Sequence, residues 1–164
     1  MAAGPTYEAI ATSTLGTATN SVVFSSIPGT YTDLILVISA TRPSGFDDGS
    51  IRFNGDTANN YSTIILAGDG GTVSTTRYAN YNLGLNYLYN SQVTTNISYI
   101  MGYTSTWRHK TVLTKVADAT TGGYRSNITL WKNTSAITTI ELINSGSSNF
   151  GAGSIFSLYG IKCA

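Results

Sequence analysis

The sequence predicts an all-β protein, an antiparallel β-sandwich with a jelly-roll-like order of strands. Three observations predict this fold class. Apolar and polar residues alternate along many short segments, which is typical of half-buried strands. Turn-forming residues separate these segments at intervals of about 8–12 residues, as in sandwiches. Thr, Ser, Asn and Gly together make up 74 of the 164 residues, a composition of strands and turns.

The alternation predicts a strand wherever apolar side chains recur at every second position. Such segments cover residues 7–12, 21–25, 33–41, 50–54, 62–67, 73–79, 81–89, 97–103, 110–117, 127–132, 138–144 and 154–161. The clearest run starts at Tyr81 and ends at Tyr89. The run Leu34 to Ile38 is apolar at consecutive positions, which predicts a central strand that is covered on both sides.

Turns and core positions follow from the same pattern. Gly-containing pairs such as Pro28-Gly29 and Asn54-Gly55 tolerate turn dihedrals and mark the connections. No segment carries a helical apolar stripe, and a single helical turn is allowed only over residues 57–61. Alternate apolar positions predict the core residues, which are Leu34, Leu36, Ile38, Ile140, Leu142, Phe156 and Leu158.

Length and charge limit the domain organisation and the class of protein. A chain of 164 residues predicts one domain over 1–164, in which residues 1–6 form an extended N-terminal arm that orders on a partner. Nine basic and eight acidic residues, without a basic cluster, argue against nucleic-acid binding. No apolar run of membrane-spanning length and no signal peptide are visible. The single cysteine, Cys163, cannot form an internal disulfide.

Reactive groups are scarce, and the sequence therefore predicts no enzyme and no cofactor. His109 is the only histidine, and Trp107-Arg108-His109-Lys110 is interpreted as a surface turn that enters a strand. The eight carboxylates cannot be brought together as a glycosidase pair from the sequence. Gly68 to Thr72 lacks the Gly-Lys-Ser/Thr ending of a phosphate-binding loop and fits a hairpin turn.

Metal binding has one weak candidate. Without a Cys/His cluster, no transition-metal site is proposed. Asn54, Asp56 and Asn59 offer oxygens that suit calcium, but Asn-Gly-Asp is also an ordinary turn sequence. The expected metal site is therefore none, with calcium near Asn54 and Asp56 left open.

The aromatic residues are the candidate interface. Six of the eleven tyrosines lie between positions 78 and 103, and a tryptophan follows them. Such residues anchor protein interfaces and also stack on sugar rings, although tyrosine is common on strand faces in any case. Subunit contact, glycan contact and plain strand structure therefore remain as alternatives. The candidate residues are Tyr78, Tyr81, Tyr87, Tyr89, Tyr99, Tyr103 and Trp107.

Four segments resemble a family of small virion structural proteins of tailed bacteriophages, common among cyanophages. They begin with Phe-Ser-Ser-Ile-Pro-Gly-Thr-Tyr, Arg-Phe-Asn-Gly-Asp-Thr, Leu-Trp-Lys-Asn-Thr and Asn-Phe-Gly-Ala-Gly-Ser, and they cover residues 24–34, 52–62, 130–140 and 149–161. The stretch from 78 to 118 carries no family segment. The resemblance implies a jelly-roll-like module, often trimeric, on the outside of a virion, without catalytic residues.

Two function classes follow from this resemblance. The first is a capsid decoration, or cement, protein that binds the phage major capsid protein and stabilises the shell. The second is a receptor- or glycan-binding module of a tail or head fibre, with a host surface glycan as partner. The absence of a coiled-coil stalk favours decoration. We therefore expect a homotrimer on the capsid exterior of a virion, made in the host cytoplasm, with no membrane or nucleic-acid partner.

Overall fold

The computed structural model describes residues 6–41, 49–85, 93–118, 123–144 and 148–162. In these ranges every regular element is a strand, and no helix is long and apolar enough to span a membrane. The strands are β1 (Tyr7–Thr14), β2 (Ser21–Phe24), β3 (Asp33–Ala40), β4 (Gly49–Phe53), β5 (Tyr61–Gly68), β6 (Val73–Tyr81), β7 (Gly84–Leu85), β8 (Thr94–Met101), β9 (Lys110–Asp118), β10 (Tyr124–Trp131), β11 (Ile140–Asn144) and β12 (Ile155–Ile161).

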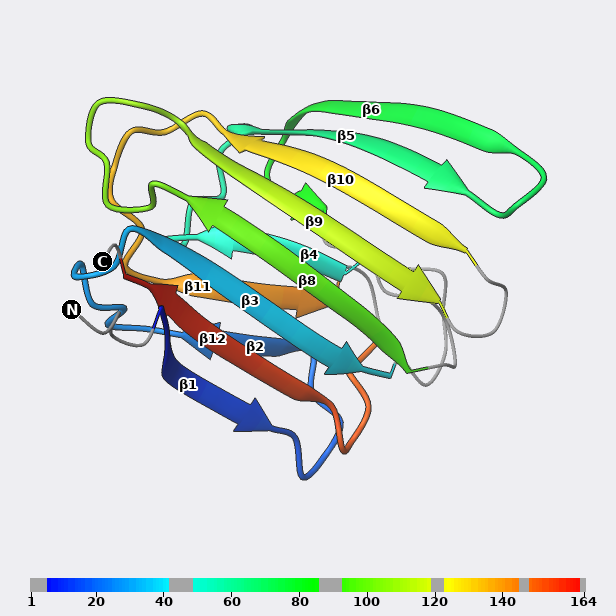
Figure 1. Cartoon of the computed structure of the whole chain (residues 1–164), viewed down its shortest axis with the longest axis horizontal. Coiled ribbons are helices and arrows are strands. Elements are labelled where there is room, and N and C mark those ends of the chain that lie inside the picture. Colours follow the sequence, from blue (N-terminus) through cyan, green and yellow to red (C-terminus); the bar gives the residue numbers. More distant parts are fainter. Residues whose placement is uncertain (1–5, 42–48, 86–92, 119–122, 145–147, 163–164) are drawn as a thin grey trace.

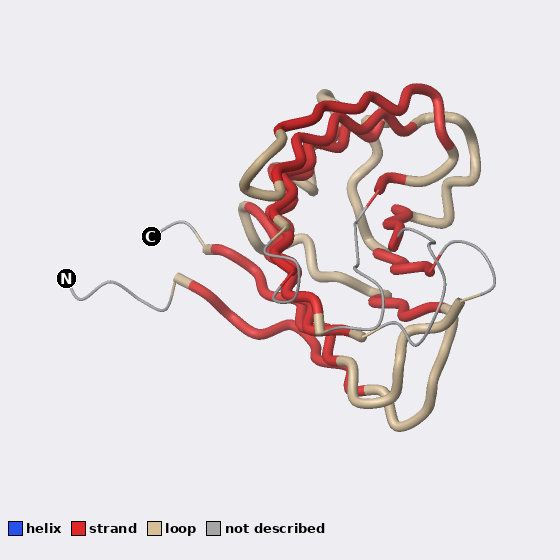
Figure 2. Tube along the Cα trace, turned by 90° about the vertical axis from the view of Figure 1, so that its right-hand side faces the viewer, coloured by secondary structure: helices blue, strands red, loops and turns tan. Residues whose placement is uncertain are grey.

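The strands form two antiparallel sheets that pack face to face as a sandwich. The larger sheet has eight strands in the order β1-β12-β3-β8-β9-β10-β5-β6, and the smaller has four in the order β2-β11-β4-β7 (Figure 1). The larger sheet curves around the smaller one (Figure 2), and Tyr7 at the start of β1 pairs with Ile161 at the end of β12. The predicted fold class, a jelly-roll-like β-sandwich, is confirmed.

The core lies between the sheets and consists of the inward-facing residues of both. In β3 these are Leu34, Leu36 and Ile38, which are at most 2% exposed. They face apolar residues of β11 in the smaller sheet and neighbour those of β12 in their own sheet. All seven predicted core residues are buried, which confirms the prediction; the other four are Ile140, Leu142, Phe156 and Leu158.

An aromatic cluster closes the core under β5 and β10. The rings of Phe53 and Trp131 lie 5.4 Å apart, and Tyr61 stacks on Trp131 at 6.4 Å. The Tyr61 hydroxyl accepts a hydrogen bond from the Phe53 backbone N–H at 2.9 Å, which satisfies its buried oxygen. Burial raises the pKa of Tyr61 to about 12, so the hydroxyl stays neutral.

The single strand predicted over residues 81–89 is wrong. Tyr81 ends β6 in the larger sheet, whereas Gly84 and Leu85 form β7 in the smaller one. Asn80 adopts a left-handed conformation with φ of 59°, and the pairing of β6 with β5 shifts register beside Tyr61. This local bend sends the chain out of one sheet and into the other, while positions 86–89 lie outside the described residues.

Two smaller expectations also fail. Residues 57–60 form no helical turn, because the Asp56 carboxylate accepts the Ala58 N–H at 2.9 Å and so favours a local turn over a helix. β3 is central, third in its sheet, but in the described part of the chain only its inner face is covered by a second layer. Its outer residues Ile35 and Val37 line an open hollow, where Ile35 is only 7% exposed without a second sheet above it.

Candidate interaction surface

The outer face of the eight-stranded sheet carries a row of apolar side chains that crosses six strands. Strand register places one outward-facing residue of each strand directly beside the next. We call this row the outer stripe, and in strand order it consists of Tyr159, Ile35, Tyr99, Leu113, Ile128 and Ile64. At about 4.8 Å between strands, it extends over roughly 24 Å.

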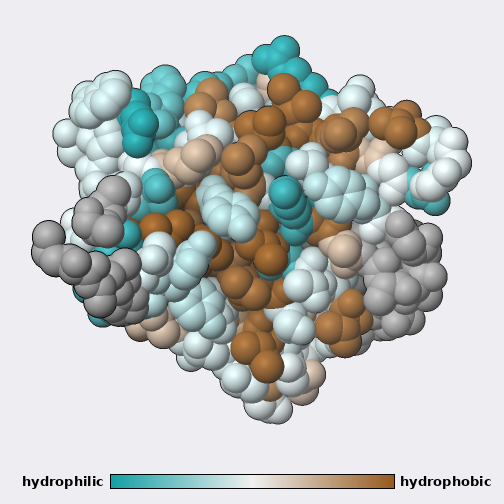
Figure 3. Space-filling view, viewed as in Figure 1, coloured by the Kyte–Doolittle hydropathy of each residue, from teal (hydrophilic) through white to brown (hydrophobic). Residues whose placement is uncertain are grey.

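Most of the outer stripe is open to solvent. Tyr99 is 38% exposed, Leu113 37%, Ile128 47% and Ile64 52%. Figure 3 views this face and shows apolar side chains gathered along its middle, with pale tyrosine rings beside them. An apolar surface of this extent is unusual on a monomeric soluble protein and indicates an interaction site.

Two shallow hollows lie at the ends of the outer stripe. The first, of about 370 Å³, is lined by three tyrosines and three aliphatic residues, which are Tyr7, Tyr99, Tyr159, Ile35, Val37 and Ile97. The second, of about 430 Å³, lies over β10, β5 and β6, where Ile64 and Ile128 meet Arg77 and Lys132. Leu113 lies between the two, since it neighbours Tyr99 on one side and Ile128 on the other.

Charge is sparse on this face. Among the outward-facing residues paired across β12, β3, β8, β9, β10, β5 and β6, the charged ones are Asp33, Lys115 and Arg77. Asp33 accepts the Gly102 N–H at 2.6 Å at the end of the strands, and Arg77 lies at the far side. A partner therefore meets mainly apolar and neutral polar groups, with Lys115 on β9 and with Arg77 and Lys132 at the second hollow.

The predicted interface residues divide among different places. Tyr99 lies in the outer stripe, and Trp107 lies on the β8–β9 loop, where it is 79% exposed. Tyr78 and Tyr81 lie on the edge strand β6, with their rings edge to face at 5.4 Å. Tyr87 and Tyr89 lie outside the described residues.

The prediction of Tyr103 as an interface residue is wrong. Its side chain is fully buried and cannot contact a partner in this conformation. Its hydroxyl donates a hydrogen bond to the Pro28 carbonyl and accepts one from the Tyr31 N–H at 3.3 Å. The predicted strand over 97–103 also ends earlier, at Met101, and Tyr103 follows in the turn. There the ring fills the end of the core rather than a surface.

The residues considered for calcium serve the fold. The Asn54 side-chain oxygen accepts the N–H groups of Thr138 and Thr139, and its amide donates to the Ala136 carbonyl. Asp56 accepts from the Trp131 indole at 2.7 Å, besides its bond to Ala58. In the described ranges no three His, Cys, Asp or Glu residues gather as a metal-binding group.

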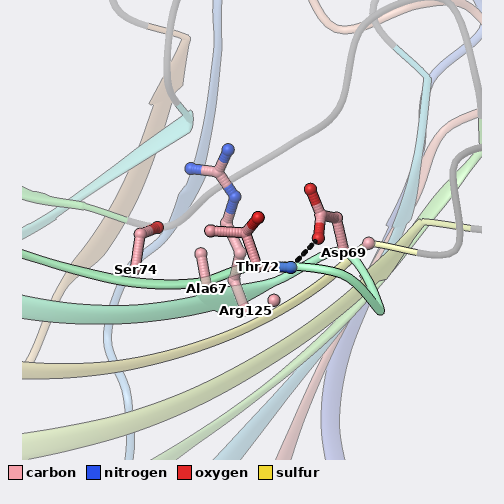
Figure 4. A pocket seen from close by; sticks show the side chains of 7 residues that line it. Ala67, Asp69, Thr72, Ser74 and Arg125 are labelled. Carbon is pink, nitrogen blue, oxygen red and sulfur yellow. Dashed lines mark hydrogen bonds between the residues drawn. The ribbon is translucent and has the colours of Figure 1, made fainter.

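The glycine-rich segment 68–72 forms the predicted hairpin turn, between β5 and β6. Its Asp69 carboxylate accepts the Thr72 and Gly71 N–H groups at 2.6 and 2.9 Å, and these bonds lower the pKa of Asp69. A pocket of about 250 Å³ lies beside this turn, where Arg125 and Ser74 project from neighbouring strands (Figure 4). One Asp69 carboxylate oxygen already accepts the two backbone N–H groups of the turn, and we propose no catalytic or binding role for this pocket.

Sequence reasoning missed most of the outer stripe. Ile64 lies in a continuous apolar run with Ile65 and Leu66, in which alternation cannot tell the inner face from the outer one. Ile128 alternates with the polar Asn127 and Thr129, a pattern that predicts Ile128 as the buried residue. The structure shows the opposite, because Asn127 and Thr129 face inward.

No protein-family model matches the sequence, and no curated protein matches it. Among solved structures, the chain is similar to a variant of the alginate lyase Aly36B in complex with an alginate tetrasaccharide. That match has 12% identity, covers 93% of this chain and 79% of the lyase chain, and has a TM-score of 0.41.

The chain is also similar to Scytalido-glutamic peptidase with a peptide-based transition-state analogue. Here identity is 13%, coverage is 86% of this chain and 74% of the peptidase, and the TM-score is 0.35. Both neighbours are enzymes by their descriptions. Similarities at these TM-scores carry no argument about what this chain does.

Proposed function

We propose that this chain is a structural, non-catalytic protein of a tailed-phage virion, and specifically a capsid decoration protein. It works as a homo-oligomer, expected to be a trimer, that binds the major capsid protein from outside and stabilises the shell. The observation that carries the proposal is the open apolar face of the eight-stranded sheet. We assign this face to a second copy of the chain.

The size of the face supports that assignment. Eight strands at about 4.8 Å and strands of about eight residues give a face of roughly 900 Å². A stable protein interface buries about 800 Å² on each partner. A second copy laid against this face therefore covers enough total area for a stable contact without help from the remaining surface.

The composition and the resemblance support the phage assignment. Charged residues make up 10% of the chain, which suits a protein whose contacts are apolar and neutral polar rather than charge-paired. The four segments that resemble phage virion proteins span residues 24–161 in order. Each of the four reaches into the large sheet, at one end of β3, β5 and β10 and over the whole of β12, so the resemblance and the proposed contact involve the same layer.

The alternative is a glycan-binding module of a fibre, and one observation favours it. Tyr7, Tyr99 and Tyr159 line the first hollow, where aromatic rings offer faces for the C–H groups of a sugar. This hollow contains few hydrogen-bond partners for sugar hydroxyls, since its other lining residues are Ile35, Val37 and Ile97. The decoration hypothesis therefore ranks first.

Antibody labelling of virions separates the two functions. Label over the whole head and hundreds of copies per particle support decoration, whereas label at the tail tip and a dozen or two copies support the fibre module. Shells depleted of the protein should rupture at a lower temperature, and added protein should restore them. Depleted particles that are equally robust but no longer adsorb to cells overturn the decoration proposal.

A further inference from the structure

Trp107 is the most exposed large apolar side chain in the described part of the chain, at 79%. It belongs to the loop of residues 102–109 that joins β8 to β9, and this loop extends beyond the ends of the two strands (Figure 1). An indole left in water contributes nothing to the core. Its ring is therefore available to a partner, and tryptophan is enriched at protein interfaces.

The loop that presents Trp107 is held in place from below by a buried lysine. Lys110 is fully buried, and its ammonium donates to the carbonyls of Ser105, Arg108 and Thr134 at 2.6, 3.0 and 3.1 Å. These bonds use all three ammonium protons and tie both sides of the loop to the segment before β11.

Two further contacts fix the start of the loop. Tyr103 is buried, and its carbonyl accepts the Ile137 N–H at 2.8 Å. The Gly102 N–H donates to Asp33 at 2.6 Å. A loop with this many internal bonds presents its tip in one conformation, which reduces the entropy lost on binding.

Arg108 lies beside Trp107 and completes the tip. Its guanidinium lies 5.5 Å from the centre of the indole ring and packs so closely on Gly102 that a Cβ atom there would come within 1.8 Å of it. The loop contains no acidic residue, and no ion pair of Arg108 is found in the described ranges. The guanidinium is thus oriented by packing, with its charge left for a partner.

We propose that Trp107 and Arg108 form the anchor by which the protein binds the capsid shell. Trp107 enters an apolar pocket of a shell subunit, and Arg108 pairs with a carboxylate at the rim of that pocket. Tryptophan and arginine are the residue types that most often dominate interface energies. The anchor rests on the proposed function, and because its loop lies beyond the strand ends rather than on the outer face of the sheet, we expect the protein to bind its own copies and the shell at the same time.

Binding of three variants to purified shells stripped of this protein tests the anchor. Trp107→Ala is expected to raise the Kd for shells by about thirtyfold or more, as for a central interface residue. Arg108→Gln is expected to raise it by about tenfold. Thr106→Ala, an exposed change in the same loop, is the matched control and should stay within about twofold.

Two checks keep the outcomes distinct. Melting temperature and oligomer mass should be the same for wild type and Trp107→Ala, because the indole is mostly in solvent. Wild-type protein that binds shells no better than an unrelated protein overturns the proposed function, and the anchor with it. Wild-type binding that Trp107→Ala leaves intact overturns the anchor alone. If Trp107→Ala abolishes phage adsorption to host cells but leaves shell binding intact, the glycan alternative is favoured and the anchor is overturned as well.

Discussion

The ring of Tyr31 lies against the backbone of Gly160, so closely that a Cβ atom at position 160 would come within 2.2 Å of the ring Cγ. Gly160 belongs to β12 and pairs with Leu34 of β3, at the end of the core. Tyr31 is itself buried there. The ring thus occupies the space that any larger residue at position 160 would need.

Substitution Gly160→Ala is expected to lower the free energy of unfolding by about 1–3 kcal/mol, the usual effect of overpacking. Urea denaturation followed by fluorescence measures it. Gly16→Ala is the control, because nothing lies within 4 Å of a Cβ atom there. Equal denaturation midpoints for the two variants would show that Tyr31 moves aside without cost.

Core packing is tested at Leu36, which is fully buried in β3. Leu36→Ala should destabilise the protein by about 2–5 kcal/mol, because it removes buried methyl groups and leaves a cavity. Leu66→Ala makes the same change at a residue that is 44% exposed, and there the loss should be well below that range. A loss below about 0.5 kcal/mol for Leu36→Ala contradicts the assigned core.

Two buried asparagines should respond in opposite directions. Asn96 and Asn127 are both fully buried on the inner face of the large sheet. Asn96 accepts the Ser98 hydroxyl at 3.1 Å, whereas neither amide atom of Asn127 has a hydrogen-bond partner in the described part of the chain. Leucine has a similar size, so Asn127→Leu should stabilise by about 1 kcal/mol and Asn96→Leu should destabilise by about 1–3 kcal/mol. Denaturant melts that show Asn127→Leu as the more harmful change refute this prediction.

Acid stability should depend on Asp56. Burial raises its pKa, but hydrogen bonds from Asn60, Trp131 and Ala58 outweigh this and lower the pKa below its ordinary value. A carboxylate with a lowered pKa in the folded state stabilises fully above its unfolded pKa of about 3.9, and this contribution is lost as the pH falls through the folded pKa. Stability should therefore decline below about pH 4 through this group.

The variant Asp56→Asn isolates the effect. At pH 7 it should be less stable than wild type by about 1–3 kcal/mol, because hydrogen bonds to a charged acceptor are lost. As the pH falls below 4, the two proteins should converge, since wild-type Asp56 becomes neutral as well. Thermal melts at pH 7, 5 and 3 measure the difference. A difference that is constant across this range would mean that the carboxylate charge is unimportant.

Self-association through the outer stripe is tested at Ile128, which is 47% exposed. Ile128→Lys should shift the protein toward monomer in light scattering at tens of micromolar, because it puts a charge into an apolar contact. Val23→Lys is the matched control, since Val23 is 52% exposed on the outer side of the smaller sheet. If wild type is monomeric at every concentration, or if the two variants have equal masses, the outer stripe is not the surface of self-association.

Local sequence pattern predicted strands well where one face is apolar and the other polar. In β11, the predicted core residues Ile140 and Leu142 are buried, and the polar Glu141 between them lies on the other face. The pattern failed where both faces carry apolar residues, as in β5, or where the buried face is polar, as around Asn127. Which face is covered depends on the second sheet, and that information is not local.

The burial of Lys110, which holds the loop that carries the anchor, also could not be predicted from local sequence. The alternation with Val112 and Thr114 places Lys110 on the inner face of β9, but lysine is almost never fully buried, so the sequence suggests an exposed residue. Its burial depends on three carbonyls, of which the Thr134 oxygen comes from a distant segment. Such a set of acceptors exists only after the sandwich has formed.

β12 is the last strand in the sequence but lies between β1 and β3, so the large sheet can be completed only at the end of synthesis. Thr12 and Ser157, which face each other across β1 and β12, are 145 positions apart, and a ribosome needs about 7–30 s to add that many residues. Until β12 is made, β1 has no neighbour in its sheet, and the edge of β3 that pairs with β12 stays open from the time β3 is made. The growing chain therefore exposes a strand edge to its copies on the same messenger, and its yield in the cell should depend on chaperones that cover this edge until β12 emerges.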